Sequence, residues 1–248
     1  MIRLAAARLS ALQCYPVQVG PLEVFMDLRL PTCRDWFLQD LESWERLERK
    51  VMQQVVRPGM VVFDIGANIG LQTSYLSSLV GPSGHVFAFE PNPMLGNLLK
   101  RTCQSLPNAT FFPTALSDEK GTASFYIPMD HTMAGFQDWT RLPTERSEVE
   151  MDRLDDLNLP QPDFIKCDVE GAELKVFKGA LRTLSGQPTI LFEINEHTVK
   201  PYNQPATAAL DFLKALDVYD FFQVTDAEEV PFDHFNGNVL AVPKKREC

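Results

Sequence analysis

The sequence alternates short apolar segments with helical segments, and this alternation is the feature that most restricts how the chain can fold. The apolar runs are VVFDIG (61–66), HVFAFE (85–90), DFIKCD (163–168) and TILFEIN (189–195), and a segment with helical spacing follows each of them. Unbroken apolar runs are typical of strands buried on both faces of a sheet. Strands that alternate with crossover helices predict a mostly parallel, doubly wound α/β sheet.

The two ends of this pattern are less regular. Apolar residues at three- and four-residue spacing predict one amphipathic helix over 34–56, after a short strand in 21–30. We therefore divide the chain into an N-terminal strand and helix packed on the core, 1–57, and a main domain, 58–248. FFQV and NVLAVP near the end predict a closing hairpin. Residues 128–150 carry no clear periodicity, so we expect a mobile surface excursion that includes His131 and Trp139.

The charge and the cysteine content disfavour a nucleic-acid-binding protein and a disulfide-stabilised one. The formal net charge is −10, with 23 Lys and Arg against 33 Asp and Glu, which disfavours a nucleic acid as the main partner. The five cysteines are scattered and form no CxxC pair, so we expect free thiols in a reducing compartment. No apolar run approaches the roughly 18 residues of a membrane span. Arg8 interrupts the only signal-like segment, and we expect a cytoplasmic protein with a frayed N-terminus.

The stretch VVFDIGANIG (61–70) ends a predicted strand with Asp64 and continues into a turn of small residues. Ligands of such sheets bind at the carboxyl ends of the strands. The spacing of Gly66 and Gly70 does not match the GxGxxG fingerprint of dinucleotide sites, and a carboxylate at Asp64 would repel a pyrophosphate. An amino acid moiety fits better, with its ammonium beside Asp64 and its carboxylate on the amides of the turn.

Glu90 ends the next predicted strand, 20 residues beyond Gly70. An acidic side chain at this place accepts hydrogen bonds from ribose hydroxyls. An amino acid at one end and a ribose at the other describe S-adenosylmethionine. Taken singly, Asp64 could be a helix cap and Glu90 a solvated strand end, but their spacing in successive βα units favours the cofactor.

These motifs resemble the FkbM family of S-adenosylmethionine-dependent methyltransferases. The resemblance runs from about residue 61 to 243 and is most specific in DFIKCDVEGAELKVFKGA (163–180). It implies a class I methyltransferase fold: a Rossmann-like, doubly wound sheet of about seven strands, mostly parallel, with an antiparallel last strand. It also implies O-methylation of a hydroxyl group on a small molecule or glycan.

The resemblance implies roles for individual residues. Those implied to bind the methionine part and the ribose are Asp64, Gly66, Ala67, Asn68, Gly70 and Glu90, while Leu116 and Ser117 would border the adenine. Asp168 and Glu170 would face the methyl group, and a hydroxyl acceptor needs a base.

Glu170 is our first candidate for that base, and His197 is a second. Glu193 and Asn195, two residues apart on one face of a strand, are candidate substrate contacts. With Asp168 they could instead hold Mg²⁺, although we favour plain hydrogen bonding and predict no metal site.

Two rival functions stay open at this level. One is a noncatalytic Rossmann-like binding or scaffold domain, and the other, less favoured, is an NAD-dependent oxidoreductase. The predicted helix over 34–56 could pack on its own domain or on a second copy of the chain, so a homodimer is possible on this evidence.

Overall fold

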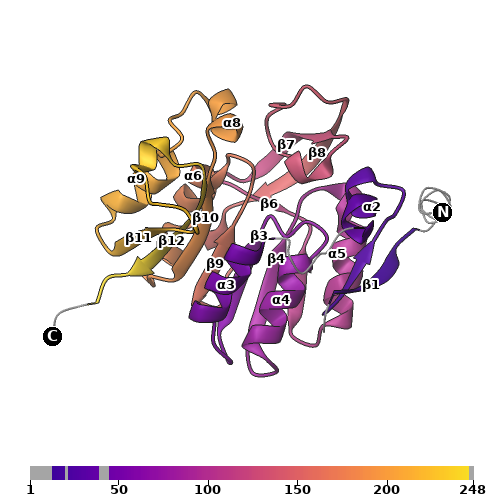
Figure 1. Cartoon of the computed structure of the whole chain (residues 1–248), viewed down its shortest axis with the longest axis horizontal. Helices are drawn as coiled ribbons and strands as arrows, with labels where there is room; N and C mark the ends of the chain where they lie inside the picture. The colour runs from indigo at the N-terminus through magenta and orange to yellow at the C-terminus, as the bar shows by residue number, and fades with distance from the viewer. Residues whose placement is uncertain (1–12, 20–21, 39–44, 246–248) are drawn as a thin grey trace.

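The computed structural model describes residues 13–19, 22–38 and 45–245. The expected frayed start of the chain and the middle of the expected helix over 34–56 lie outside these residues. The described residues form a seven-stranded sheet in the order β11-β12-β10-β9-β3-β4-β5 (Figure 1). Its strands are β3 (Val61–Ile65), β4 (His85–Phe89), β5 (Ala109–Phe112), β9 (Phe164–Cys167), β10 (Thr189–Ile194), β11 (Tyr219–Gln223) and β12 (Gly237–Pro243).

The sheet confirms the predicted fold class. β10, β9, β3, β4 and β5 pair in parallel, and the last strand, β12, runs antiparallel to both β10 and β11. The predicted closing hairpin is therefore present, and its second strand inserts between β10 and β11. All carboxyl ends of the parallel strands meet at one edge of the sheet.

Helices cover both faces of the sheet, so that the molecule has three layers. On one face, α3 (Arg46–Val55) and α4 (Leu71–Val80) bury apolar side chains against β3, β4, β9 and β10. On the other, α6 (Glu173–Lys178), α7 (Leu181–Ser185) and α9 (Ala208–Ala215) pack on the same strands. The helix α5 (Pro93–Ser105) packs beside α4 and against β5. Cys167 lies wholly inside the second of these cores.

The N-terminal residues differ from the expected strand and single helix. β1 (Tyr15–Val19) and β2 (Leu22–Met26) form a hairpin that shares a core with α5, and α2 (Pro31–Leu38) follows it. Residues 31–38 and 46–55 form two helices, and Glu45 before the second has a left-handed backbone with φ 49°. Each helix buries its own apolar stripe, which is why the spacing looked like that of one continuous helix.

Residues 128–150 are only partly the irregular surface excursion expected from the sequence, because 144–150 belong to a strand. β8 (Thr144–Asp152) pairs antiparallel with β7 (Gly121–Pro128) along its whole length, and β6 (Ala115–Leu116) joins them in a three-stranded sheet. This small sheet rises above the carboxyl edge of the main sheet, beside the short helix α8 (Glu196–Val199) on the other side of the edge (Figure 1). Charged residues dominate β8, which hid its strand character, and only Val149 and Met151 are buried in it.

The remaining elements are short 3-10 helices: η1 (His131–Met133), η2 (Leu154–Asp156), η3 (Lys200–Tyr202) and η4 (Phe232–His234). Within the described ranges, no helix has the length and apolar character needed to cross a membrane.

Candidate functional site

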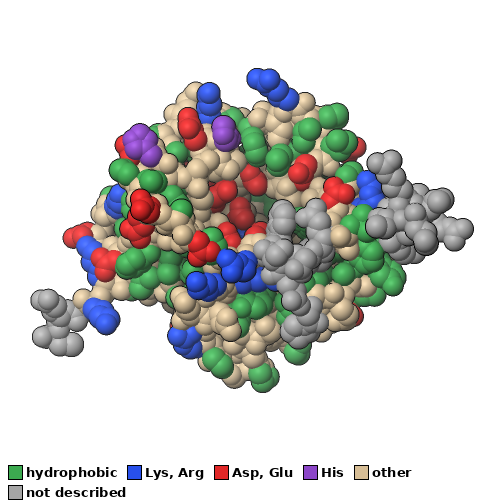
Figure 2. All heavy atoms as spheres, viewed as in Figure 1, with side chains coloured by type: hydrophobic (Ala, Val, Ile, Leu, Met, Phe, Trp, Pro, Cys, Tyr) green, Lys and Arg blue, Asp and Glu red, His purple; other side chains and the backbone are tan. Residues whose placement is uncertain are grey.

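A cavity of about 350 Å³ opens at the carboxyl edge of the main sheet. Residues from β3, β4, β9 and β10 form its floor, α2 and α3 contribute one wall, and the β7–β8 sheet and η1 contribute another. Figure 2 shows Asp and Glu side chains gathered in and around this hollow. The carboxylates that line it are Glu45, Glu48, Asp64, Glu90, Asp168, Glu170 and Glu193. An acidic cavity of this kind suits a positively charged ligand.

Asp64 stands at the end of β3 with its side chain fully buried. Its Oδ2 accepts a hydrogen bond of 2.6 Å from Thr73 Oγ1 on α4, and its Oδ1 has no partner within the described chain. Burial raises the pKa of this carboxyl, and the nearby Lys166 opposes that shift. A buried oxygen without a donor is costly, so Asp64 is placed to receive a hydrogen bond from a ligand ammonium.

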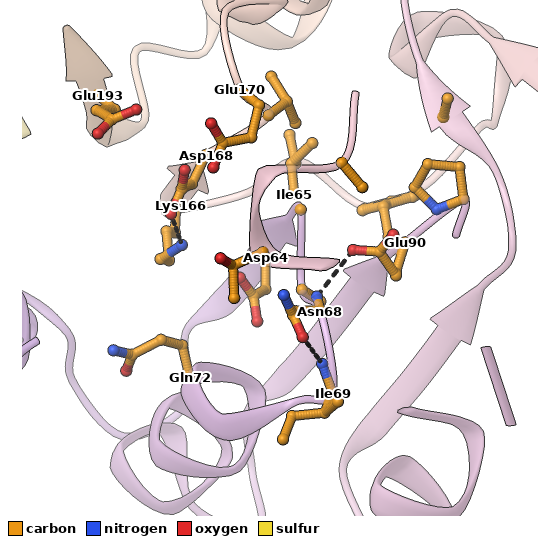
Figure 3. Close-up of a pocket in the computed structure, with 18 of the residues that line it drawn as sticks. Asp64, Ile65, Asn68, Ile69, Gln72, Glu90, Lys166, Asp168, Glu170 and Glu193 are labelled. Atoms are coloured by element: carbon orange, nitrogen blue, oxygen red, sulfur yellow. Dashed lines mark hydrogen bonds and ion pairs between the residues drawn. The ribbon is translucent and has the colours of Figure 1, made fainter. Parts of the chain in front are cut away.

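The turn after Asp64 does not offer the free amides that the sequence suggested. The N–H groups of Gly66 and Ala67 both donate to Phe89 O, at 3.0 and 2.9 Å, and Gly70 N–H donates to Ala67 O. Asn68 N–H donates to Glu90 Oε2 and Ile69 N–H to Asn68 Oδ1 (Figure 3). Each backbone donor from 66 to 70 is therefore already used.

The two glycines of the turn are required by packing within the protein. A Cβ on Gly66, whose φ is +82°, would lie 1.8 Å from the backbone oxygen of Asp168 at the end of β9. A Cβ on Gly70 would lie under 3.0 Å from side chains of α5. Packing against β9 and α5 therefore requires glycine at both positions, whatever binds in the cavity.

Glu90 lies just beyond β4 and is almost completely buried. Its Oε1 accepts a hydrogen bond from Asn92 N–H at 2.8 Å, and its Oε2 accepts one from Asn68 N–H at 2.9 Å. Burial raises the pKa of Glu90 to about 7, against the opposing effect of these two bonds. Because each carboxylate oxygen can accept a second bond, the side chain remains able to receive ribose hydroxyls.

Lys166 is a site residue to which sequence reasoning gave no role. It lies in β9 opposite Asp64 in the strand register, is buried, and points its Nζ at Asp168 Oδ2, 3.0 Å away (Figure 3). Asp168, Glu45 and Asp64 hold its pKa above the usual range, although burial opposes this. Lys166 is the one Lys or Arg that lines the cavity in the described part of the chain. The apolar residues that flank it in the strand were the signal of a buried amine.

Glu170 and Glu193 lie across the cavity from Glu90 (Figure 3). Glu170 follows β9 in a left-handed conformation, φ 52°, which is strained for a residue with a side chain. Burial raises its pKa well above the usual range, and the charges of Asp168 and Glu193 add to the shift. Burial and the charge of Asp168 likewise raise the pKa of Glu193. Strain and shifted titration at one turn are typical of functional sites.

Aromatic side chains line the wall of the cavity formed by α2 and the β7–β8 sheet: Trp36, Phe125, His131 and Phe136. His131 is buried, with its Nε2 3.4 Å from Cys33 Sγ and its ring 5.9 Å from that of Trp36. The expectation that His131 belongs to a mobile surface loop is therefore wrong. Burial lowers its pKa to about 4, so the ring is neutral at physiological pH.

The other residues proposed for the site lie at different distances from the cavity. Leu116 lines it, as expected, but Ser117 is buried beside it and donates to Asp118. Asn195 caps α8 through a bond from His197 N–H to its Oδ1. His197 is exposed and lines a separate depression, so the structure does not bring it together with Asp168 and Glu170.

Glu173 is buried and its Oε1 accepts hydrogen bonds from Val169 and Gly171 N–H, so it stabilises the turn that carries Glu170. Among the described residues, no three His, Cys, Asp or Glu side chains are grouped so that they could hold a metal ion.

Comparison with known proteins places the sequence beside known methyltransferases. The family model described as the methyltransferase FkbM domain matches residues 64–221. The 2-O-methyltransferase NoeI of Sinorhizobium fredii is 27% identical over 195 residues, which are 70% of this chain and 79% of NoeI. The hexuronic acid methyltransferase AglP of Haloferax volcanii is 30% identical over 167 residues, 64% of this chain and 66% of AglP.

Solved structures show the same fold at low sequence identity. The crystal structure of methyltransferase FkbM from Methylobacillus flagellatus aligns with a TM-score of 0.50 at 16% identity, over 96% of this chain and 58% of that one. SMU.1697c, a putative methyltransferase from Streptococcus mutans solved with SAH, gives 0.50 at 12% identity, over 80% and 97%. The resemblance predicted from the motifs is thus confirmed, and this chain belongs to the FkbM family of S-adenosylmethionine-dependent methyltransferases.

Proposed function

We propose that this methyltransferase transfers a methyl group from S-adenosylmethionine to a hydroxyl group of a saccharide. The observation that carries the proposal is the arrangement of the cavity: donor-side Asp64 and Glu90 share one cavity with Glu170 and Glu193. The name of one relative, a 2-O-methyltransferase, supports an oxygen acceptor, and that of another, a hexuronic acid methyltransferase, supports a saccharide. The aromatic wall of Phe125 and Phe136 offers the flat apolar surface on which a sugar ring packs.

Four side chains are suited to hold the donor. Asp64 Oδ1 would receive the ammonium, and Glu90 would receive the ribose hydroxyls. Since the amides of the turn are used internally, Lys166 is the better partner for the carboxylate of the methionine moiety. Leu116 would border the adenine. When bound, S-adenosylmethionine supplies an electrophilic methyl carbon on a sulfonium, and the acidic cavity favours its positive charge.

Glu170 is the proposed general base. Without a bound cation its raised pKa favours the protonated form, because burial and the charges of Asp168 and Glu193 disfavour a further negative charge. A positive charge in the cavity lowers the pKa of a neighbouring carboxyl, which would let Glu170 accept a proton from the acceptor hydroxyl. Much of the rate enhancement would come from the rigid walls, which hold the hydroxyl in line with the methyl carbon.

The first test is thermal unfolding with S-adenosylhomocysteine, with NAD and with no ligand. A ligand at 100 times its dissociation constant adds about 2.7 kcal/mol, which raises the midpoint by roughly 5–10 °C in a chain of this size. We expect this shift with S-adenosylhomocysteine and none with NAD. Asp64→Asn should remove it, whereas the matched exposed variant Asp220→Asn should keep it. No shift at millimolar ligand would overturn the assignment of the donor site.

The acceptor is tested separately, by transfer of isotopically labelled methyl groups to a panel of oligosaccharides with and without uronic acid residues. The expected product is a methyl ether, located on the sugar by NMR. Labelled methyl on nitrogen or carbon would contradict the proposed acceptor while leaving the donor site intact.

A further inference from the structure

A second depression, of about 400 Å³, lies outside the cavity and has the opposite charge. Trp139 and Arg141 line it from the segment that precedes β8, and His197, Lys200 and Pro201 line it from α8 and η3. In the view of Figure 2, basic and histidine side chains stand above the acidic hollow, over α8 and the β7–β8 sheet. The contrast is sharp, because the whole chain carries a formal charge of −10.

The basic side chains of this depression form no ion pairs with the described residues. The side chains of Arg141, His197 and Lys200 are exposed, and none forms a hydrogen bond or ion pair with the described residues. Some other surface cations are paired, for example Lys120 with Asp152 at 2.9 Å and Lys244 with Asp217. Cations that line one concave site without internal partners are available to an anionic ligand.

The two segments that line the depression are the ones that enclose the proposed base. A Cβ on Gly135 would lie 3.5 Å from the Cβ of Glu170, so the segment leading to Trp139 passes directly over that residue. On the other side, a Cβ on Gly171 would lie 2.3 Å from the backbone oxygen of Thr198 in α8. The segments that line the depression therefore pack on both sides of the turn that carries Glu170.

Trp139 gives the depression a surface for a sugar. The indole ring lines it, and the indole N–H is buried without a hydrogen-bond partner among the described residues. Buried donors rarely stay unpaired in native proteins, which points to an acceptor atom supplied by a ligand or by water. An aromatic ring beside an Arg and a Lys can pack against the face of a sugar while the cations bind its charged substituent.

We propose that this depression is an acceptor subsite that binds a carboxylate or phosphate carried by the saccharide to be methylated. The inference rests on the proposed function and narrows its substrate class to acidic saccharides. Arg141 and Lys200 bind the anionic group, Trp139 packs against the sugar, and His197 donates from the α8 side. The acidic cavity excludes the anion itself, so the charged group stays outside while a hydroxyl enters.

The test is NMR titration of the full chain with S-adenosylhomocysteine bound, following the indole N–H signal of Trp139. The signal is assigned with Trp139→Phe, since the chain has three tryptophans. The probes are glucuronate, glucose 6-phosphate and glucose, at constant ionic strength. We expect a saturable shift with glucuronate or glucose 6-phosphate and none with glucose. Which anion binds identifies the source of the charge.

Two double variants with the same charge change separate the subsite from general electrostatics. The double variant Arg141→Gln with Lys200→Gln should bind the anionic sugar at least about tenfold more weakly, as expected for the loss of charge-assisted hydrogen bonds. The control, Lys100→Gln with Lys178→Gln, changes two exposed residues on α5 and α6 and should leave the affinity for the anionic sugar unchanged. Both should bind S-adenosylhomocysteine like the wild type. Donor binding with no response to either anion, or an equal response to glucose, would overturn the subsite alone, while loss of donor binding in the wild type would overturn the proposed function.

Discussion

Lys166 Nζ lies 3.0 Å from Oδ2 of Asp168, the residue that follows β9, and the lysine is buried while the aspartate keeps a third of its side chain exposed. Asp64 stands opposite Lys166 in the neighbouring strand. The ammonium thus sits among carboxylates that would repel one another in its absence. This pair is the electrostatic centre of the site.

Replacing Lys166 with Met should destabilise the protein by about 3 kcal/mol, because it leaves buried carboxylates without their counter-charge. Equilibrium unfolding in urea measures the loss. Lys175→Met is the matched control, since Lys175 pairs with Asp118 at 3.3 Å but both side chains are one-third exposed. An exposed pair of this kind is worth up to about 1 kcal/mol. Equal losses in the two variants would show that burial of Lys166 has no energetic consequence.

Gly66→Ala should destabilise the protein by about 3 kcal/mol, because the added Cβ would lie 1.8 Å from the backbone oxygen of Asp168 and φ is +82°. Gly59→Ala is the control for backbone strain alone: its φ is +88° and a Cβ there would meet only Ser83 Oγ, at 3.6 Å. That substitution should cost about 1 kcal/mol. Urea unfolding of both variants separates steric contact from strain, and a Gly66→Ala loss no larger than that of Gly59→Ala would contradict the packing explanation.

The main sheet could be predicted from the sequence because its buried strands follow a single physical rule, an apolar run bounded by a turn. The small sheet could not, because β8 exposes one face and carries charged residues such as Glu148 and Glu150 between its few buried ones. The helix over 34–56 was predicted as one because two shorter helices happen to bury side chains at compatible spacing.

The spacing of Asp64 and Glu90 at the ends of successive strands was enough to predict that both line one site. The partners of the site residues were not predictable, because they come from other segments of the chain. The amides of the 66–70 turn are used by Phe89 and Glu90, which no local pattern reveals. Lys166 lies opposite Asp64 of the neighbouring strand, and His131 contacts Cys33 and Trp36 of α2.

Glu170→Gln should reduce turnover at least about 100-fold, since an amide cannot accept the proton of the acceptor hydroxyl. Affinity for S-adenosylhomocysteine should stay near that of the wild type, because the side chain lies across the cavity from Glu90, the proposed ribose contact (Figure 3). Calorimetric titration measures the affinity, and labelled methyl transfer measures turnover. Glu196→Gln, an exposed change of the same kind on α8, is the control. Unchanged turnover would remove Glu170 from the mechanism.

The same Glu170→Gln variant should be more stable than the wild type at pH 8, by at least about 1 kcal/mol, and equal to it near pH 4.5. Burial, with the charges of Asp168 and Glu193, raises the pKa of Glu170 in the folded chain above its ordinary value of 4.5. At pH values between the ordinary pKa and the raised pKa of the folded chain, the folded state binds more protons than the unfolded state. The stability of the wild type therefore falls as the pH rises through this range. The neutral amide removes this loss.

The measurement is urea unfolding of the ligand-free protein at pH values from 4.5 to 8. Gln and Glu have the same shape and would share the strained backbone of φ 52°, so a stability gap that widens with pH reports ionisation alone. Glu196→Gln, on the exposed surface, should show no widening gap. A constant gap for Glu170→Gln would mean that Glu170 ionises in the folded protein as readily as in water, and a base held ready by bound positive charge would then be unnecessary.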